Sequence, residues 1–128
     1  MNVNEFAIKL DNAAFDVKAI AQLSTTNSFT EDDAYEIQRL SIEKRIERGE
    51  TFVGLKLGFT SFAKMEQMGV HDMIWGRLTS SMWLENGGEM EISKFIHPRA
   101  EPEIAFLLKK DLDREISLEE IPEYILAC

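Results

Sequence analysis

The sequence changes from helical to strand periodicity at one stretch, Thr51-Phe52-Val53-Gly54-Leu55-Lys56-Leu57-Gly58-Phe59. Neighbouring side chains of a strand lie on opposite faces, so this stretch predicts one apolar and one mixed face. The apolar face is formed by Val53, Leu55, Leu57 and Phe59. On the mixed face, Lys56 lies between Gly54 and Gly58, which leaves room for a ligand beside the backbone. A solvent-facing lysine on an edge strand has the same pattern.

Helices are expected before this stretch, within residues 1–50. Apolar residues recur at helical spacing from about Asn4 to Leu23. Thr30 is a good N-cap with three acidic residues after it, which predicts a second helix to about Arg48 that ends at Gly49. Both helices are interpreted as packing elements.

Strands are expected to predominate in residues 51–128, after a short helix from Phe62 to Met68. Residues 78–84 and 89–96 are predicted to pair as a hairpin, because Asn86-Gly87 between them is a strong turn signal. The expected fold class is therefore α+β, with N-terminal helices followed by a mostly antiparallel β region.

A capping box, Ser117-Leu118-Glu119-Glu120, predicts one more helix near the end of the sequence. This helix is expected to continue through Ile121 to about Leu126.

Two glutamates lie two residues apart in Ile96-His97-Pro98-Arg99-Ala100-Glu101-Pro102-Glu103-Ile104-Ala105-Phe106. In a strand, Glu101 and Glu103 would project from the same face. Two like charges at this spacing are unfavourable unless a positive group lies between them, and a divalent cation with oxygen ligands fits that position. A solvated acidic edge strand is the alternative, and Pro102 is compatible with it.

Composition excludes several classes of protein. The 128 residues are 45% hydrophobic and 29% charged, as in ordinary soluble domains. With 14 basic and 23 acidic residues the net charge is -9, which argues against a nucleic-acid or membrane-binding surface. No apolar stretch could span a bilayer and no signal peptide is recognisable. The single cysteine, Cys128, rules out an internal disulfide framework and fits a cytoplasmic protein.

Four motifs, in this order and spacing, resemble one family. They are Gly54-Leu55-Lys56-Leu57-Gly58-Phe59-Thr60-Ser61, Gln67-Met68-Gly69-Val70, Trp75-Gly76-Arg77-Leu78 and Pro98-Arg99-Ala100-Glu101-Pro102-Glu103-Ile104-Ala105-Phe106. The family is that of the 4-oxalocrotonate decarboxylases and 2-keto-4-pentenoate hydratases, in the fumarylacetoacetate hydrolase superfamily.

The resemblance implies a metal site. Family members hold Mg²⁺ or Mn²⁺ with a Glu-x-Glu pair, which corresponds to Glu101 and Glu103, and with a third carboxylate further along the chain. The family's lysine corresponds to Lys56, as a catalytic and substrate-binding residue. The third carboxylate is expected beyond Cys128, so the chain resembles the N-terminal half of such an enzyme. Its fold would then be incomplete, and the chain alone inactive.

The activity implied is decarboxylation of 2-oxo-3-hexenedioate (4-oxalocrotonate) to 2-hydroxypenta-2,4-dienoate and CO2, in the catabolism of aromatic compounds. Hydratases of the family tend to carry an acidic residue where this chain has Ile74, so Ile74, as a substrate-contacting residue, favours the decarboxylase. A hydratase, or a non-catalytic fragment of either enzyme, is the alternative. The expected partners are a small 2-oxo dicarboxylic acid, further copies in a homo-oligomer and a hydratase.

Overall fold

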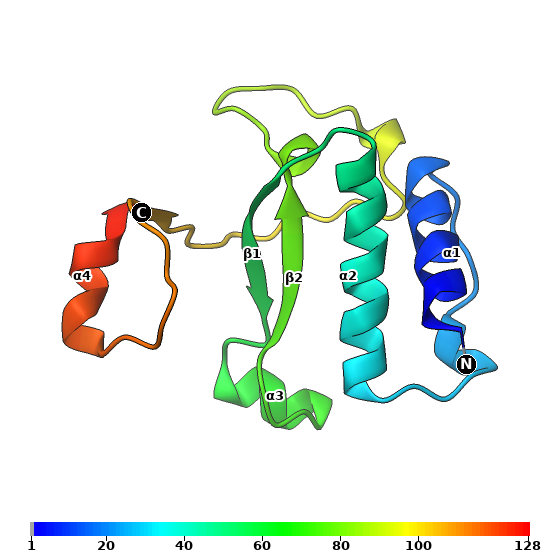
Figure 1. Cartoon of the computed structure of the whole chain (residues 1–128), viewed down its shortest axis with the longest axis horizontal. Coiled ribbons are helices and arrows are strands. Elements are labelled where there is room, and N and C mark those ends of the chain that lie inside the picture. Colours follow the sequence, from blue (N-terminus) through cyan, green and yellow to red (C-terminus); the bar gives the residue numbers. More distant parts are fainter. Residues whose placement is uncertain (1) are drawn as a thin grey trace. The chain divides into compact units, whose positions relative to one another are not determined.

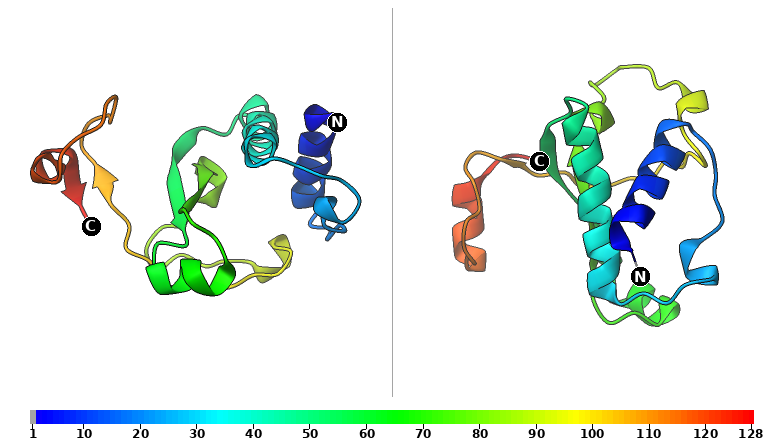
Figure 2. Two further views of the ribbon diagram at one scale, coloured as in Figure 1. Left: turned by 90° about the horizontal axis from the view of Figure 1, so that it is seen from below. Right: turned by 45° about the vertical axis from the view of Figure 1, so that its right-hand side comes forward.

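The computed structural model describes residues 2–128 and begins with two helices that lie side by side, α1 (Val3–Phe15) and α2 (Glu31–Glu47) (Figures 1 and 2). Small or branched apolar side chains are buried where these helices pack, namely Ala7, Ala13, Ile37 and Ile42. The predicted N-cap of α2 is present, as half of a capping box: the Asp33 amide donates to Thr30 Oγ1 at 3.1 Å, and the Thr30 amide donates to Asp33 Oδ2 at 2.9 Å.

The first helix is shorter than predicted, because α1 ends at Phe15 instead of continuing to about Leu23. The Lys18 amide donates to the Ala13 carbonyl at 2.9 Å, and the Val17 amide to the Ala14 carbonyl at 3.3 Å. This pair of bonds is a Schellman motif, and it places Val17 in the left-handed region at φ +51°. The residue usual at that position is glycine, so its absence concealed the end of the helix.

An ion pair with one buried partner joins α1 to the end of α2. Asp11 of α1 is 3% exposed, and both of its carboxylate oxygens accept hydrogen bonds from the Arg48 guanidinium, at 2.6 and 2.7 Å. The Arg48 guanidinium also lies 5.1 Å from the centre of the Phe15 ring. The Asp11 carboxylate raises the pKa of Arg48 further above its usual range. The end of α2 is therefore fixed against α1 by a two-bond fork.

Two antiparallel strands follow, β1 (Phe52–Gly58) and β2 (Ile74–Thr79), with α3 (Phe62–Met68) between them (Figure 1). The predicted strand and short helix are thus confirmed.

Near the start of β1, Ser81 Oγ donates to Glu50 Oε2 at 2.7 Å, and Arg45 lies 3.6 Å from the same carboxylate. Burial by itself would raise the pKa of Glu50. The nearby hydroxyl and guanidinium groups stabilise the carboxylate by more than this, so the pKa of Glu50 is lowered.

The hairpin predicted from residues 78–84 and 89–96 is wrong. The turn itself forms, because the Gly88 amide donates to the Glu85 carbonyl at 2.8 Å and Gly87 has φ +77°. Its flanks, however, contain single 3-10 turns at Ser80–Met82 and Ile92–Lys94 and do not pair with each other. These turns bend both flanks away from the extended conformation that a ladder requires.

Residues 98–128 form a second compact unit, which is described here by itself. A short antiparallel ladder joins β3 (Leu107–Leu108) to β4 (Ile125–Ala127) around α4 (Ile121–Tyr124). The predicted capping box at Ser117 and Glu120 is present, but the last helix ends at Tyr124 instead of reaching Leu126. Its final residues become β4, since pairing with β3 satisfies their backbone groups.

The fold class is α+β, as predicted, and both ladders are antiparallel. Within residues 2–128, no helix is long and apolar enough to cross a membrane. The predicted boundary between a helical segment (1–50) and a catalytic region (51–128) stays a prediction.

The Asp11–Arg48 fork generates an asymmetric prediction. Arg48→Met should lower the free energy of unfolding by about 2–3 kcal/mol, because it leaves the Asp11 carboxylate buried without its partner. Asp11→Asn should cost only about 1 kcal/mol, since an amide oxygen still accepts a hydrogen bond and Arg48 is partly solvated. Urea unfolding measures both values. Lys44→Met, which removes a half-exposed cation of α2 from its surface pair with Glu47, is the matched control with a change under about 0.5 kcal/mol. Equal losses for Arg48→Met and Lys44→Met would contradict the role of the fork.

The second unit offers a prediction about pH. The Arg114 guanidinium, 2.5 Å from Glu120 Oε1, together with the Ser117 amide, lowers the pKa of Glu120 to about 2. Because the pKa of Glu120 is lower in the folded state than its ordinary value of 4.5, its charged carboxylate stabilises the fold at any pH above about 4.5. This stabilisation is lost as the pH falls from there toward 2. Titration of Glu120 by carboxyl-carbon NMR should give this low value. Arg114→Gln should raise the pKa toward 4.5, whereas Lys110→Gln, which removes a cation elsewhere in the unit, should leave it low.

Candidate functional site

The site begins with Lys56 in the middle of β1. Its cross-strand neighbour is Gly76 of β2, while Gly54 pairs with Leu78 and Gly58 pairs with Ile74. Because paired residues of an antiparallel ladder share a face, Lys56 lies on one face with all of these residues. The predicted grouping of Lys56 with its two flanking glycines is confirmed.

This face is open to solvent at one end and covered by a side chain at the other. A Cβ atom built on Gly54 or on Gly76 would meet nothing within 4 Å, so the backbone around Lys56 is open to an approaching molecule. A Cβ atom on Gly58 would lie 2.9 Å from Ile74 Cγ1. The Ile74 side chain therefore lies over Gly58 and closes that end of the face. We call this surface, formed by Lys56, Ile74 and the three glycines, the lysine face.

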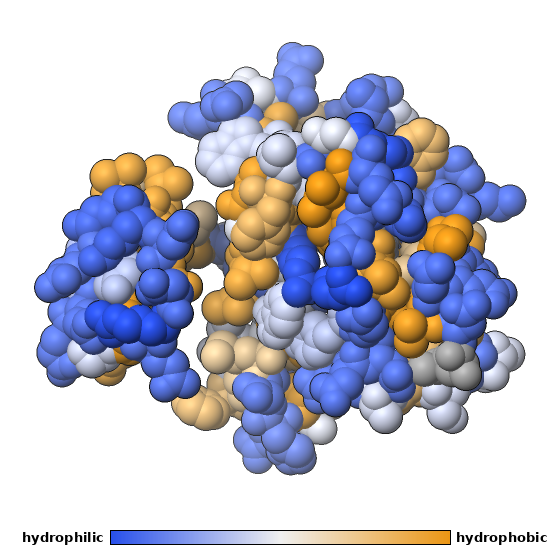
Figure 3. All heavy atoms as spheres, in the orientation of Figure 1, coloured by the Kyte–Doolittle hydropathy of each residue, from blue (hydrophilic) through white to orange (hydrophobic). Residues whose placement is uncertain are grey.

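The opposite face of the sheet is apolar along β1, and its leucines are exposed. Leu55 and Leu57 of β1 are 54% and 47% exposed, and Figure 3 shows hydrophobic side chains gathered over this strand. Their cross-strand neighbours are Arg77 and Trp75, and the Arg77 guanidinium lies 4.7 Å from the centre of the Trp75 ring. Leu55 and Leu57 share this face as predicted, whereas Val53 lies at a register shift and Phe59, with φ +54°, follows the end of β1.

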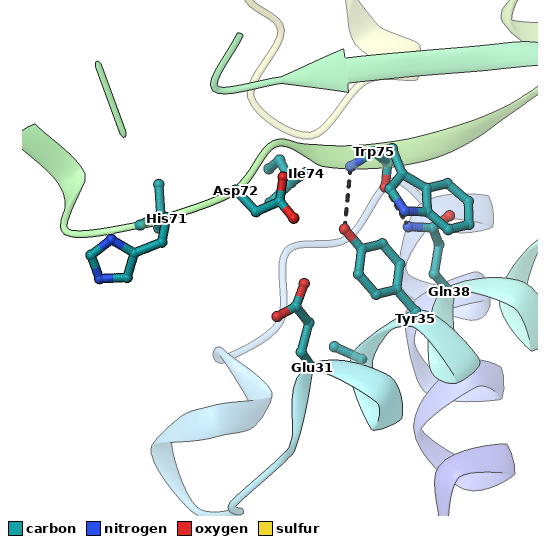
Figure 4. Close-up of a pocket in the computed structure, with 9 residues that line it drawn as sticks. Glu31, Tyr35, Gln38, His71, Asp72, Ile74 and Trp75 are labelled. Carbon is teal, nitrogen blue, oxygen red and sulfur yellow. Dashed lines mark hydrogen bonds between the residues drawn. The ribbon is translucent and has the colours of Figure 1, made fainter. Parts of the chain in front are cut away.

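Side chains of α2 hold the outer edge of β2 (Figure 4). The Gln38 side-chain amide donates to the Trp75 carbonyl at 3.0 Å, and the Arg77 amide donates to Gln38 Oε1 at 3.2 Å. The Trp75 amide donates to the Tyr35 hydroxyl at 3.4 Å, and the Tyr35 and Trp75 rings stack at 4.7 Å. Sequence reasoning missed Tyr35 and Gln38. Nothing in the local pattern of α2 distinguishes these two residues, because their partners lie on β2.

A pocket of about 560 Å³ lies where the start of α2 meets the segment before β2. Its lining comprises Glu31, Ala34, Tyr35, Gln38, Val70, His71, Asp72, Ile74 and Trp75. In Figure 4 the carboxylates of Glu31 and Asp72 point toward one another, while the His71 ring points away. Two carboxylates at one opening repel an anionic ligand, so this pocket is a poor candidate for binding a dicarboxylic acid.

Glu101 and Glu103 lie in the second unit, on exposed, irregular backbone. The predicted strand is wrong here, since residues 99–106 are not part of a β-ladder. Pro98 and Pro102 remove two backbone donors from this region, which makes ladder formation unfavourable.

The two carboxylates are hard oxygen donors of the type that Mg²⁺ binds, so the donor set fits a divalent cation. Within residues 2–128, no group of three His, Cys, Asp or Glu side chains could hold a metal ion. The structure thus brings Lys56 and Ile74 together on the lysine face. Glu101 and Glu103 belong to the other unit, which is described separately.

Most of the chain is similar in sequence to known enzymes. No protein-family model matches the chain. A 4-oxalocrotonate decarboxylase of Pseudomonas sp. is 54% identical over 117 residues, which are 91% of this chain and 46% of that protein. A 2-hydroxypent-2,4-dienoate hydratase of Pseudomonas putida is 40% identical over 112 residues, 86% of this chain and 50% of that protein.

Solved structures agree with these relatives. The 4-oxalocrotonate decarboxylase from Pseudomonas putida G7, complexed with calcium and acetate, matches with a TM-score of 0.70 and 38% identity over 74% of this chain and 37% of that one. Its complex with magnesium and adipate matches with a TM-score of 0.60 and 36% identity, over 64% of this chain and 32% of that one.

The chain belongs to the family of the 4-oxalocrotonate decarboxylases and 2-keto-4-pentenoate hydratases, as its motifs predicted. It spans about half the length of the curated relatives that it matches.

The contact between Ile74 and Gly58 can be tested with two glycine substitutions. Gly58→Ala should lower the free energy of unfolding by about 1–2 kcal/mol, because the new methyl group displaces the stiff, branched Ile74 side chain. Gly54→Ala is the matched control, since its methyl group would enter open space on the same strand. Thermal unfolding of both variants measures the difference. A Gly58→Ala variant as stable as Gly54→Ala would show that Ile74 does not lie over Gly58.

Proposed function

We propose that the protein is a divalent-metal-dependent carbon-carbon lyase that converts 2-oxo-3-hexenedioate to 2-hydroxypenta-2,4-dienoate and CO2. The observation that carries this proposal is the 54% identity to a 4-oxalocrotonate decarboxylase over 91% of the chain, against 40% to a hydratase. The bond to the remote carboxylate breaks, its electron pair enters the conjugated 2-oxo chain, and one proton is taken up.

Glu101 and Glu103 are proposed as two ligands of Mg²⁺, with Mn²⁺ as an alternative. The magnesium and calcium complexes of the related decarboxylase support a divalent cation. When bound, such a cation acts as a Lewis acid that stabilises negative charge on the 2-oxo acid, by several kcal/mol in typical enzymes.

Lys56 is proposed as the catalytic and substrate-binding residue of the lysine face. The substrate is a dianion and the chain carries a net charge of -9, so a local cation is needed to attract it. The open backbone at Gly54 and Gly76 leaves room for a carboxylate to reach the Lys56 ammonium. There the ammonium can either hold the carboxylate or transfer a proton.

Ile74 is proposed as the substrate-contacting residue that favours decarboxylation. Its side chain closes one end of the lysine face with carbon atoms and offers no group that could activate water. An apolar surface beside the departing carboxylate favours loss of CO2, because it disfavours the charged carboxylate more than the neutral product.

A hydratase that adds water to 2-keto-4-pentenoate is the second candidate. The 40% identity to a hydratase over 86% of the chain supports it. The two activities differ in their products, because only the decarboxylase releases CO2 from 2-oxo-3-hexenedioate.

Four further properties belong to the same proposal. We propose a homo-oligomer, because Leu55 and Leu57 are exposed in the described chain. A complex with a hydratase, a cytoplasmic location and a role in aromatic catabolism follow from the family resemblance. Residues 51–128 are proposed as the first part of a β-rich catalytic domain, and chain 1–128 alone as inactive.

The proposal is tested with the purified product of the complete gene. It should release CO2 from 2-oxo-3-hexenedioate when Mg²⁺ is present and stop when the metal is chelated. Glu101→Gln and Glu103→Gln should each lower kcat/KM by at least about 100-fold, since each removes a charged metal ligand. Glu115→Gln, a neutralised exposed carboxylate of the same unit, should keep the wild-type rate.

Full activity in both Glu101→Gln and Glu103→Gln would disprove the metal assignment. Water addition to 2-keto-4-pentenoate without CO2 release from 2-oxo-3-hexenedioate would establish the hydratase instead.

A further inference from the structure

The outer edge of β2 faces α2, and one side chain takes the place of a neighbouring strand there. In an antiparallel ladder, successive residues direct their backbone groups alternately to the two sides, so Trp75 and Arg77 direct theirs away from β1. Gln38 accepts from the Arg77 amide at 3.2 Å and donates to the Trp75 carbonyl at 3.0 Å. Its carboxamide therefore bonds to β2 as a peptide group of a third strand would.

A carboxamide suits both of these bonds, because its nitrogen donates and its oxygen accepts from separate atoms. A carboxylate would accept from the Arg77 amide but could not donate to the Trp75 carbonyl, and an ammonium group could only donate. Tyr35 completes the edge, because its hydroxyl accepts from the Trp75 amide at 3.4 Å. All three contacts come from one helix and reach two alternate residues of one strand.

The residues that alternate with this edge are those of the lysine face. Ile74 and Gly76 flank Trp75, and they lie across from Gly58 and Lys56. A slip of β2 by one residue would exchange its two faces and bring Trp75 onto the lysine face. A fixed edge at Trp75 and Arg77 therefore fixes which side chains lie beside Lys56.

We propose that Gln38 is a positioning residue, which acts through β2 to keep Ile74 and Gly76 in place beside Lys56. This inference rests on the proposed function of the lysine face.

The first arm of the test measures amide hydrogen exchange in chain 1–128, with no substrate. Gln38→Met keeps the length and helix propensity of the side chain but removes both polar groups. The Arg77 amide should then exchange at least about tenfold faster, while the Gly76 amide, which faces β1, should change by less than about twofold. Gln67→Met, on the exposed surface of α3, is the matched control and should change neither amide.

The second arm measures kcat/KM in the product of the complete gene. Gln38→Met should lower kcat/KM about tenfold in the wild-type background, but by less than about twofold when Lys56→Met is already present. The Kd for Mg²⁺ should stay within about twofold, because the proposed ligands Glu101 and Glu103 are not on this sheet.

The outcomes separate the two proposals. Equal acceleration of the Arg77 and Gly76 amides, or no acceleration of either, would overturn the role of Gln38 whether or not the enzyme is active. An equal loss of kcat/KM in both backgrounds would also overturn it, since a purely structural defect does not depend on Lys56. If neither the wild-type protein nor its variants decarboxylate the substrate, the proposed function of the lysine face fails and the positioning role fails with it.

Discussion

The edge of β2 that Gln38 occupies is the constraint on which the first compact unit, residues 2–97, depends. A sheet of two strands is marginally stable by itself in water, so β1 and β2 need support from another element. Their support is α2, through Gln38 and Tyr35 at one end of β2 and through Arg45 at the other, where Glu50 and Ser81 meet. The helix is itself held to α1 by the Asp11–Arg48 fork. The fork therefore positions α2 against α1, and α2 in turn positions β2.

Polar contacts carry this role because the buried core is small. The buried apolar residues of the first unit include two alanines and two isoleucines, whereas Leu55 and Leu57 on β1 are about half exposed. A small core supplies little free energy and specifies register weakly. Paired polar groups add little net stability, but each is costly when it loses its partner, so they select one arrangement. In this unit, hydrogen bonds and ion pairs therefore determine how β2 is aligned with its neighbours, because the small core does so only weakly.

Much of this fold could be predicted where glycine or a cap marks a boundary. Gly49 and Gly69 each follow a helix with a positive φ, as their positions in the sequence indicated. Val17 ends α1 in the same conformation, but a branched side chain gives no such signal. The predicted turn before Gly88 is also present, but the segments on either side of it do not pair with each other. The alternating pattern around Glu101 likewise does not form a strand. Turns and caps are local, whereas a strand exists only where a partner is available.

The same distinction applies to the candidate site. Alternation along β1 placed Lys56 between two glycines because that relation needs no knowledge of other elements. Gln38 could not be found in this way, since a glutamine on a helix has meaning only once the edge of β2 lies beside it. The contact of Ile74 with Gly58 likewise depends on a cross-strand register that no single segment contains. The candidate site in this unit therefore consists of residue pairs whose members lie far apart in the sequence, so that packing determines what periodicity alone does not.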